Sequence, residues 1–156
     1  MSTAAAARPS FTTASNRIDE GANDVHIGRH RVWRQPSDVV HLIIDGDISA
    51  QEILLIFEQY RLAAREHGYV LVIADASGLG TVSADARRAL GGGSSIPMRG
   101  TVIHSTSFHA RIIARLVAGV MSLFTPTDDH PVVFLPGEAE AHAWIKARRA
   151  YLSAVA

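Results

Sequence analysis

Short hydrophobic runs alternate with longer amphipathic stretches along most of the chain. The short runs have the length of strands and lie at residues 25–34, 39–44, 69–74, 101–105 and 131–135. In the longer stretches apolar residues recur every three or four positions, as on one face of a helix, at residues 50–67, 108–124 and 138–152. Ser83 and Asp85 begin a further, short helix at residues 84–90. Strands that alternate with helices predict an α/β fold with a mixed, mainly parallel sheet faced by helices. The predicted sheet is five-stranded with about four helices, in the order strand, strand, helix, strand, helix, strand, helix, strand, helix.

The run YVLVIADASGLG at residues 69–80 is the centre of this pattern. Its apolar part is bounded by Gly68 and Asp75, is too short for an ordinary helix, and suits a strand covered on both faces. In open α/β sheets, binding usually occurs beyond the carboxyl ends of the strands. We therefore predict that the segment after Asp75 is a loop that faces a ligand or a partner.

The first predicted helix has signals at both ends. Ser49 and Glu52 have the spacing of a capping box, and Gly68 suits a left-handed C-cap. The run at residues 25–34, which precedes it, contains three arginines and is typical of an edge strand that resists edge-to-edge pairing. Because no RNA-binding signature surrounds this run, we predict no nucleic-acid partner.

Two regions supply the predicted core. The central strand contributes Val70, Leu71, Val72 and Ile73, and the helix at residues 108–124 is expected to be the best-buried helix. Its apolar face is predicted to consist of Ile112, Ile113, Leu116, Val117, Val120 and Met121. The last helix is expected to bury Trp144.

Composition places the chain among ordinary globular domains. Its 156 residues are 47% hydrophobic and 19% charged, enough for one domain with its own core. Residues 1–24 have no periodic apolar positions, so we predict a disordered N-terminal tail followed by a single domain at residues 25–153. Fifteen basic and fifteen acidic side chains balance, so no whole-molecule field attracts nucleic acid or lipid. With no cysteine and no stretch that could span a membrane, the protein is expected in the cytoplasm.

Few residues form a recognisable catalytic or metal-binding pattern. No pair among the eight histidines combines the i, i+4 spacing of a zinc helix with an intervening acid, and we predict no metal and no cofactor. The triple glycine at residues 91–93 lacks the lysine and hydroxyl residue of a phosphate loop. Ser77 lacks the preceding glycine and the evident His and Asp partners of a hydrolase elbow, so no catalytic residue is predicted.

Three acids follow predicted strands. Asp45, Asp47 and Asp75 could meet over one rim of the sheet, where paired carboxylates can transfer protons or hold Mg²⁺. Acids at strand ends are also ordinary turn and cap residues, and we favour that interpretation.

Several strings together resemble a known family. They are VLVIADASGLGTVSADARRAL, TVIHS, FHARIIARLV, PVVFL and GEAEAHAWIKARRAYL. They are similar to the SpoIIAA-like branch of the STAS superfamily (sulfate transporter and anti-sigma-factor antagonist) over residues 25–152. The resemblance implies a STAS fold and a non-enzymatic bacterial regulatory module. The implied partner is a protein, either a kinase or anti-sigma-type protein or another regulator, and a homodimer remains open.

The resemblance also implies a partner-binding segment, made of Asp75, Ser77, Gly78, Gly80, Thr81, Ser83 and Asp85. In bacterial antagonists, a partner kinase phosphorylates a serine in an Asp-Ser-Ser-Gly step at the start of the second helix. The matching step here is Ser83-Ala84-Asp85-Ala86, in which Asp85 takes the place of the second serine. We therefore predict that the usual phosphoserine switch is absent, and that Ser83 is both the helix N-cap and the candidate phosphorylation site.

A second hypothesis uses the same rim of the sheet differently. The chain is then a small-molecule or lipid-binding STAS-like domain, or an enzyme that uses Asp45, Asp75 and Ser77. Arg99 is a further polar group assigned to this rim.

Overall fold

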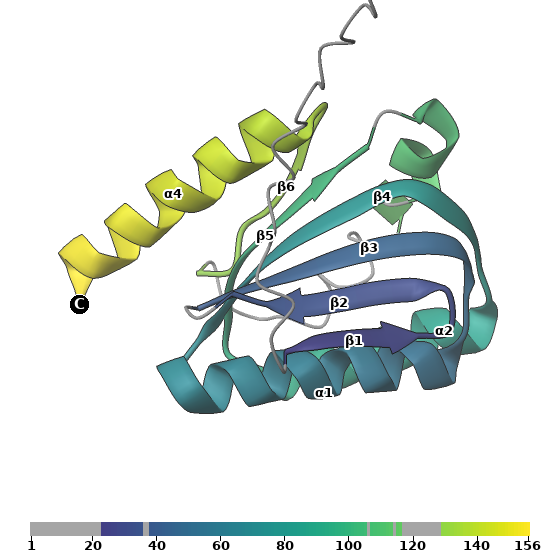
Figure 1. Cartoon of the computed structure of the whole chain (residues 1–156), viewed down its shortest axis with the longest axis horizontal. Coiled ribbons are helices and arrows are strands. Elements are labelled where there is room, and N and C mark those ends of the chain that lie inside the picture. Colours follow the sequence, from purple (N-terminus) through teal and green to yellow (C-terminus); the bar gives the residue numbers. More distant parts are fainter. Residues whose placement is uncertain (1–22, 36–37, 106, 114, 117–128) are drawn as a thin grey trace, which may run out of the picture.

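The computed structural model describes residues 23–35, 38–105, 107–113, 115–116 and 129–156. These residues form one sheet with helices on both of its faces (Figure 1). The predicted N-terminal tail lies outside the described residues up to residue 22. Asp24, the last residue of that predicted tail, begins the first strand.

The sheet has six strands, which lie side by side in sequence order. They are β1 (Asp24–Ile27), β2 (His30–Arg34), β3 (Val39–Ile48), β4 (Val70–Val82), β5 (Met98–His104) and β6 (Val132–Leu135). The pairs among β1, β2 and β3 are antiparallel, whereas β3, β4, β5 and β6 pair in parallel. The predicted α/β class and the mixed, mainly parallel sheet are confirmed.

The predicted strand count was one too low because residues 25–34 contain a hairpin. Ile27 pairs with His30, which leaves Gly28 and Arg29 as a two-residue turn. Gly28 has φ 60°, a conformation that glycine adopts without strain and that suits the first turn position. The turn residues therefore divide one basic, β-branched run into two antiparallel strands.

The helices begin and end close to where their capping signals predict. They are α1 (Ala50–His67), α2 (Ala84–Ala89) and α4 (Glu138–Val155), with a 3-10 helix, η1 (Leu90–Ser95), directly after α2. The Ser49 side chain accepts from the backbone N–H of Glu52 at 3.2 Å, and the Glu52 side chain accepts from the N–H of Ser49 at 2.8 Å, so the capping box is present. Residues 108–113 and 115–116 are also helical, while the rest of the predicted helix at 108–124 lies outside the described residues.

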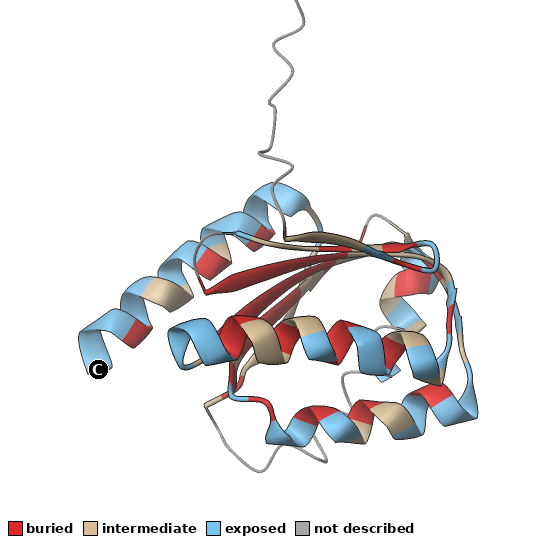
Figure 2. Cartoon of the chain, turned by 60° about the horizontal axis from the view of Figure 1, so that its bottom comes forward, coloured by how far each residue is buried: buried red, intermediate tan, exposed pale blue. Residues whose placement is uncertain are grey.

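Alternation along β4 divides the core into two layers. Val70, Val72 and Ala74 belong to the cluster on the α1 side of the sheet, whereas Leu71 and Ile73 belong to the cluster on the α4 side. In Figure 2, buried residues line the sides of α1 and α4 that face the sheet. All five β4 residues are at most 4% exposed, as expected for a strand covered on both faces.

The helical residues 108–113 and 115–116 present a different face to the sheet from the one predicted. Ile112 and Leu116 are 46% and 66% exposed, whereas Ala110 is fully buried and Ile113 packs against the α1-side cluster. The stretch has apolar residues on more than one side, so periodicity alone did not select the buried stripe, and the small Ala110 permits close approach to the sheet. The predicted contacts of Val117, Val120 and Met121 lie outside the described residues.

Trp144 is half-buried and packs against the α4-side cluster, so the expectation that it is largely buried was only partly met. Its indole ring lies where Gly100 leaves room, because a Cβ on that glycine would come within 2.9 Å of the ring. The ring therefore packs directly over the β5 backbone.

Candidate functional site

The segment after Asp75 is a strand and not the predicted loop. β4 continues to Val82, and beyond Asp75, the last residue to pair with β5, it pairs only with β3. Asp45, Gly46 and Ile48 of β3 are paired with Gly78, Leu79 and Val82 of β4, with shifts in register between them. We call this two-stranded part, residues 45–48 and 76–82, the β extension; Figure 1 shows it bending towards α2.

The two glycines of the β extension allow close approach of the strands. A Cβ on Gly78 would lie 2.9 Å from the carbonyl oxygen of Ile44, and one on Gly80 would overlap a carboxylate oxygen of Asp47. That Asp47 oxygen accepts the backbone N–H of Thr81 at 2.7 Å. Hydrogen bonds from Thr81 lower the pKa of Asp47 below its ordinary value. Neither of these two glycines has a positive φ.

Ser83 begins α2 as predicted from the sequence. Its Oγ accepts the backbone N–H of Ala86 at 3.1 Å, which satisfies one free amide at the start of the helix. Ser83 is exposed, and so is Asp85 in the first turn. Asp85 pairs with Arg88 at 2.7 Å, and both side chains are more than 70% exposed, at 75% and 78%.

The predicted site residues thus divide into two groups. Gly78, Thr81, Ser83 and Asp85 are exposed along the β extension and at the start of α2, and together we call them the β4–α2 surface. Asp75, Ser77 and Gly80 are half-buried. Asp75 and Ser77 lie at the base of the surface, where a carboxylate oxygen of Asp75 accepts the backbone N–H of Ser77 at 2.9 Å.

The acidic rim does not form a shared carboxylate site in the described part of the chain. Asp45 pairs with Arg29 at 2.9 Å, and its backbone N–H donates to Nδ1 of the fully buried His30 at 3.1 Å. Arg99 lies near the opposite end of β5, where it pairs with Asp129 at 2.6 Å, so its assignment to the rim was wrong. Among the residues that the structure describes, no three His, Asp or Glu side chains are placed to share a metal ion.

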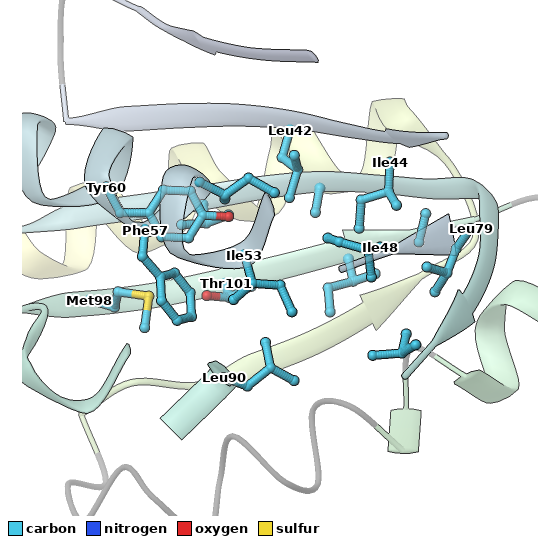
Figure 3. A pocket seen from close by; sticks show the side chains of 16 residues that line it. Leu42, Ile44, Ile48, Ile53, Phe57, Tyr60, Leu79, Leu90, Met98 and Thr101 are labelled. Atoms are coloured by element: carbon cyan, nitrogen blue, oxygen red, sulfur yellow. The ribbon is translucent and has the colours of Figure 1, made fainter. Parts of the chain in front are cut away.

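An apolar cavity lies between the sheet, α1 and η1, and sequence reasoning missed it (Figure 3). Its volume is about 100 Å³. β3, β4 and β5 supply Leu42, Ile44, Ile48, Val72, Ala74, Ala76, Leu79, Val82, Met98, Thr101 and Ile103, and the helices supply Ile53, Ile56, Phe57, Tyr60 and Leu90. The inner side of the β extension, which includes Leu79 and Val82, forms one end of the cavity.

Two of the lining residues, Tyr60 and Thr101, have polar side-chain atoms. Burial raises the pKa of the Tyr60 hydroxyl, which therefore stays protonated. The hydroxyl of Thr101 makes a 2.8 Å hydrogen bond with Nε2 of His130, another buried residue. A cavity with such walls favours an apolar occupant. The small Ala74 and Ala76 were the available sequence signal, since they leave space on one face of an otherwise bulky strand.

Within the described ranges, no helix combines the length and the apolar character that a membrane crossing requires.

Comparison with known proteins identifies the fold. No protein-family model matches the chain, and no curated protein matches it. Among solved structures, an uncharacterized protein of the DUF3478 family from Shewanella loihica PV-4, described as having a SpoIIAA-like fold, matches with a TM-score of 0.52 and 15% sequence identity. The match covers 72% of this chain and 89% of that protein. The chain therefore has a SpoIIAA-like fold, as its motifs predicted.

Proposed function

We propose that this chain is a non-enzymatic regulatory module of the cytoplasm that binds a protein partner through the β4–α2 surface. The observation that carries the proposal is the exposed start of α2, capped by Ser83 and joined directly to the β extension. The paired strands hold Thr81, Ser83 and Asp85 in fixed positions, and a rigid scaffold of this kind is a common setting for recognition residues. The SpoIIAA-like fold is consistent with this role.

The charged side chains of the β4–α2 surface can exchange their present contacts for contacts with a partner. Asp85 and Arg88 pair at 2.7 Å while remaining largely exposed, and exposed pairs of this kind contribute little to stability. Arg87 donates to the backbone carbonyl of Val82 at 2.8 Å, which leaves its charge without a carboxylate among the described residues. A partner with complementary charges can therefore replace these contacts at small cost to the fold.

Asp85 gives the start of α2 a standing negative charge. This charge is favourable near a helix N-terminus, as a phosphate would be. A phosphate added to Ser83 would also be repelled by Asp85, two residues away. We therefore propose that partner binding does not depend on phosphorylation, and that Asp85 supplies the charge that a phosphoserine supplies elsewhere.

Site-specific photo-crosslinking tests this proposal. A crosslinker at Thr81 should capture one protein that a crosslinker at Leu54, exposed on α1, does not capture. The recombinant partner should then bind the Asp85→Lys variant about tenfold more weakly or worse, because a reversed charge faces the partner. Glu58→Lys is the matched control, since Glu58 and Arg61 form the same i,i+3 pair on α1.

Two results would contradict the proposal. Equal weakening by Asp85→Lys and Glu58→Lys would exclude a specific role for the β4–α2 surface. Turnover of a substrate by the purified chain, lost in Asp75→Asn, would show that the module is an enzyme.

A further inference from the structure

A second cavity lies at the carboxyl ends of β5 and β6, on the side of the sheet that α1 covers. Its volume is about 240 Å³. The lining combines two arginines and a serine with apolar residues, and consists of Ile103, Ser105, Arg111, Arg115, Phe134, Leu135 and Pro136. We call it the arginine-lined cavity.

Arg111 and Arg115 have no carboxylate partner among the described residues, which sets them apart from most arginines of this part of the chain. Ion pairs with acids involve Arg29, Arg31, Arg34, Arg61, Arg88, Arg99, Arg148 and Arg149. Arg111 and Arg115 instead lie near the rings of Phe108 and Phe134, at 6.0 Å and 5.8 Å. Both are helical and four residues apart in sequence. Like charges at this spacing repel each other, and an anion between them would relieve the repulsion.

One row of cross-strand partners forms a floor that runs under both cavities. Leu42 pairs with Ala74, Ala74 with Ile103, and Ile103 with Phe134. Leu42 and Ala74 line the apolar cavity and Phe134 lines the arginine-lined cavity, while Ile103 lines both. The cationic site and the apolar site are therefore adjacent along a continuous hydrophobic surface.

We propose that this chain binds a single-chain amphiphile with an anionic head. The carboxylate or phosphate head lies between Arg111 and Arg115, whose guanidinium groups match either anion in geometry and charge. The alkyl chain crosses Ile103, and its last few carbons fill the apolar cavity, whose aliphatic and aromatic walls offer water few hydrogen bonds.

Other classes of anion fit the two cavities less well. A nucleotide base in the apolar cavity would meet only the side-chain polar atoms of Tyr60 and Thr101 and would lose most of its hydrogen bonds to water. A small inorganic anion would satisfy the arginines but leave the apolar cavity unused. The amphiphile is the ligand class that uses both sites.

Calorimetric titration of the full chain tests the assignment. Decanoate and decyl phosphate should bind, whereas decanol, acetate and inorganic phosphate should bind at least about tenfold more weakly, because each lacks one half of the ligand. The affinities of decanoate and decyl phosphate show which of the two head groups the chain prefers. Tight binding of either ligand supports the proposal. Binding of acetate or inorganic phosphate as tight as that of the alkyl forms would overturn it.

Variants test each cavity separately. Arg115→Gln, at an exposed position, should weaken decanoate about tenfold, because a hydrogen bond to a charged head is lost. Arg65→Gln, which replaces an exposed arginine on α1 away from both cavities, is the matched control.

Ala74→Val should weaken the binding of dodecanoate more than that of hexanoate, because it narrows the apolar cavity. Melting curves of each variant establish that it is folded. The proposal would be overturned if wild type, Arg115→Gln and Ala74→Val had equal affinities for every chain length. That result would not bear on the crosslinking test of the β4–α2 surface.

Discussion

Arg149, near the end of α4, donates a hydrogen bond from Nε to Oδ1 of Asp38 at 2.9 Å across 111 residues of sequence. The hydroxyl of Tyr69 donates to the other oxygen of the same carboxylate at 2.5 Å. Asp38 is only 6% exposed. Burial alone would raise its pKa, but the hydrogen bonds from Tyr69 and Arg149 outweigh burial and hold the pKa below its ordinary value. This carboxylate therefore joins α4 to the beginnings of β3 and β4.

We expect Tyr69→Phe to lower the free energy of unfolding by about 1 to 3 kcal/mol at neutral pH, because it leaves a buried charged acceptor short of a donor. Urea melts at pH 7 and pH 3 measure the effect. The folded-state pKa of Asp38 is depressed, so its contribution is present above the ordinary pKa and is lost as the pH falls through the folded pKa. The difference between wild type and variant should therefore shrink at pH 3.

Tyr151→Phe is the matched control for Tyr69→Phe. Tyr151 is 54% exposed, and its ring contact with Arg148 at 5.1 Å does not need the hydroxyl. We expect a change of no more than about 0.5 kcal/mol at either pH. A loss of the same size in both variants would argue that the Tyr69 hydroxyl has no special role.

His41 makes the stability of the fold depend on pH. The ring stacks on Trp33 with centroids 4.8 Å apart and lies 5.6 Å from the ring of His142. Burial, with smaller contributions from His142 and His104, lowers the pKa of His41 to about 4. Between pH 6.5 and 4 the unfolded chain binds a proton that the folded chain does not bind, so stability falls as the pH falls, by up to about 1.4 kcal/mol per pH unit.

His41→Phe should keep the stacking on Trp33 and remove the titrating group. We expect its free energy of unfolding, from denaturant melts, to fall less steeply than that of wild type between pH 6.5 and 4. His130, whose pKa burial also lowers to about 4, remains in the variant and keeps part of the slope. Parallel profiles for wild type and His41→Phe would show that His41 protonates as readily in the folded chain as in the unfolded chain.

Gly78 is needed for close strand approach, and its replacement should be costly. A Cβ there would lie 2.9 Å from the Ile44 carbonyl oxygen, a backbone atom that cannot move without disturbing the β3–β4 pairing. We expect Gly78→Ala to destabilise the fold by about 1 to 3 kcal/mol. Gly92, whose added Cβ would meet no atom within 4 Å, is the control, and Gly92→Ala should be neutral or stabilising by up to about 1 kcal/mol. Thermal melts of the two alanine variants compare them directly.

Local signals in the sequence were enough to locate most elements. Ser49, Glu52 and Gly68 define both ends of α1, and Ser83 defines the start of α2, because caps act within a few residues. The SpoIIAA-like resemblance rested on the five quoted sequence strings and gave the correct fold. The Gly-rich polar segment after Asp75 predicts a strand end there because it favours a loop locally, whereas pairing with β3 continues β4 to Val82.

Features that depend on distant contacts were not predictable from the sequence. The arginine-lined cavity joins residues that follow β5 to residues of β6, and the apolar cavity depends on where Ala74 and Leu42 meet across the sheet. The buried stripe of the helical residues 108–113 could not be predicted either, since Ile112 and Ile113 are adjacent and equally apolar. Only contact with the sheet selects Ile113 as the residue that packs inward.

Comparing the stability lost in Leu71→Ala and in Leu116→Ala tests this orientation of the helix. Leu71 is fully buried between β4 and α4, so Leu71→Ala should cost about 2 to 5 kcal/mol through lost burial and the cavity that remains. Leu116 is 66% exposed, and alanine is a strong helix former, so Leu116→Ala should change stability by no more than about 0.5 kcal/mol. Denaturant melts of the two variants, with equal m-values, give the comparison. A loss above about 2 kcal/mol for Leu116→Ala would mean that Leu116 packs inward, and that Arg111 and Arg115 on the same helix do not face the cavity beside Phe134.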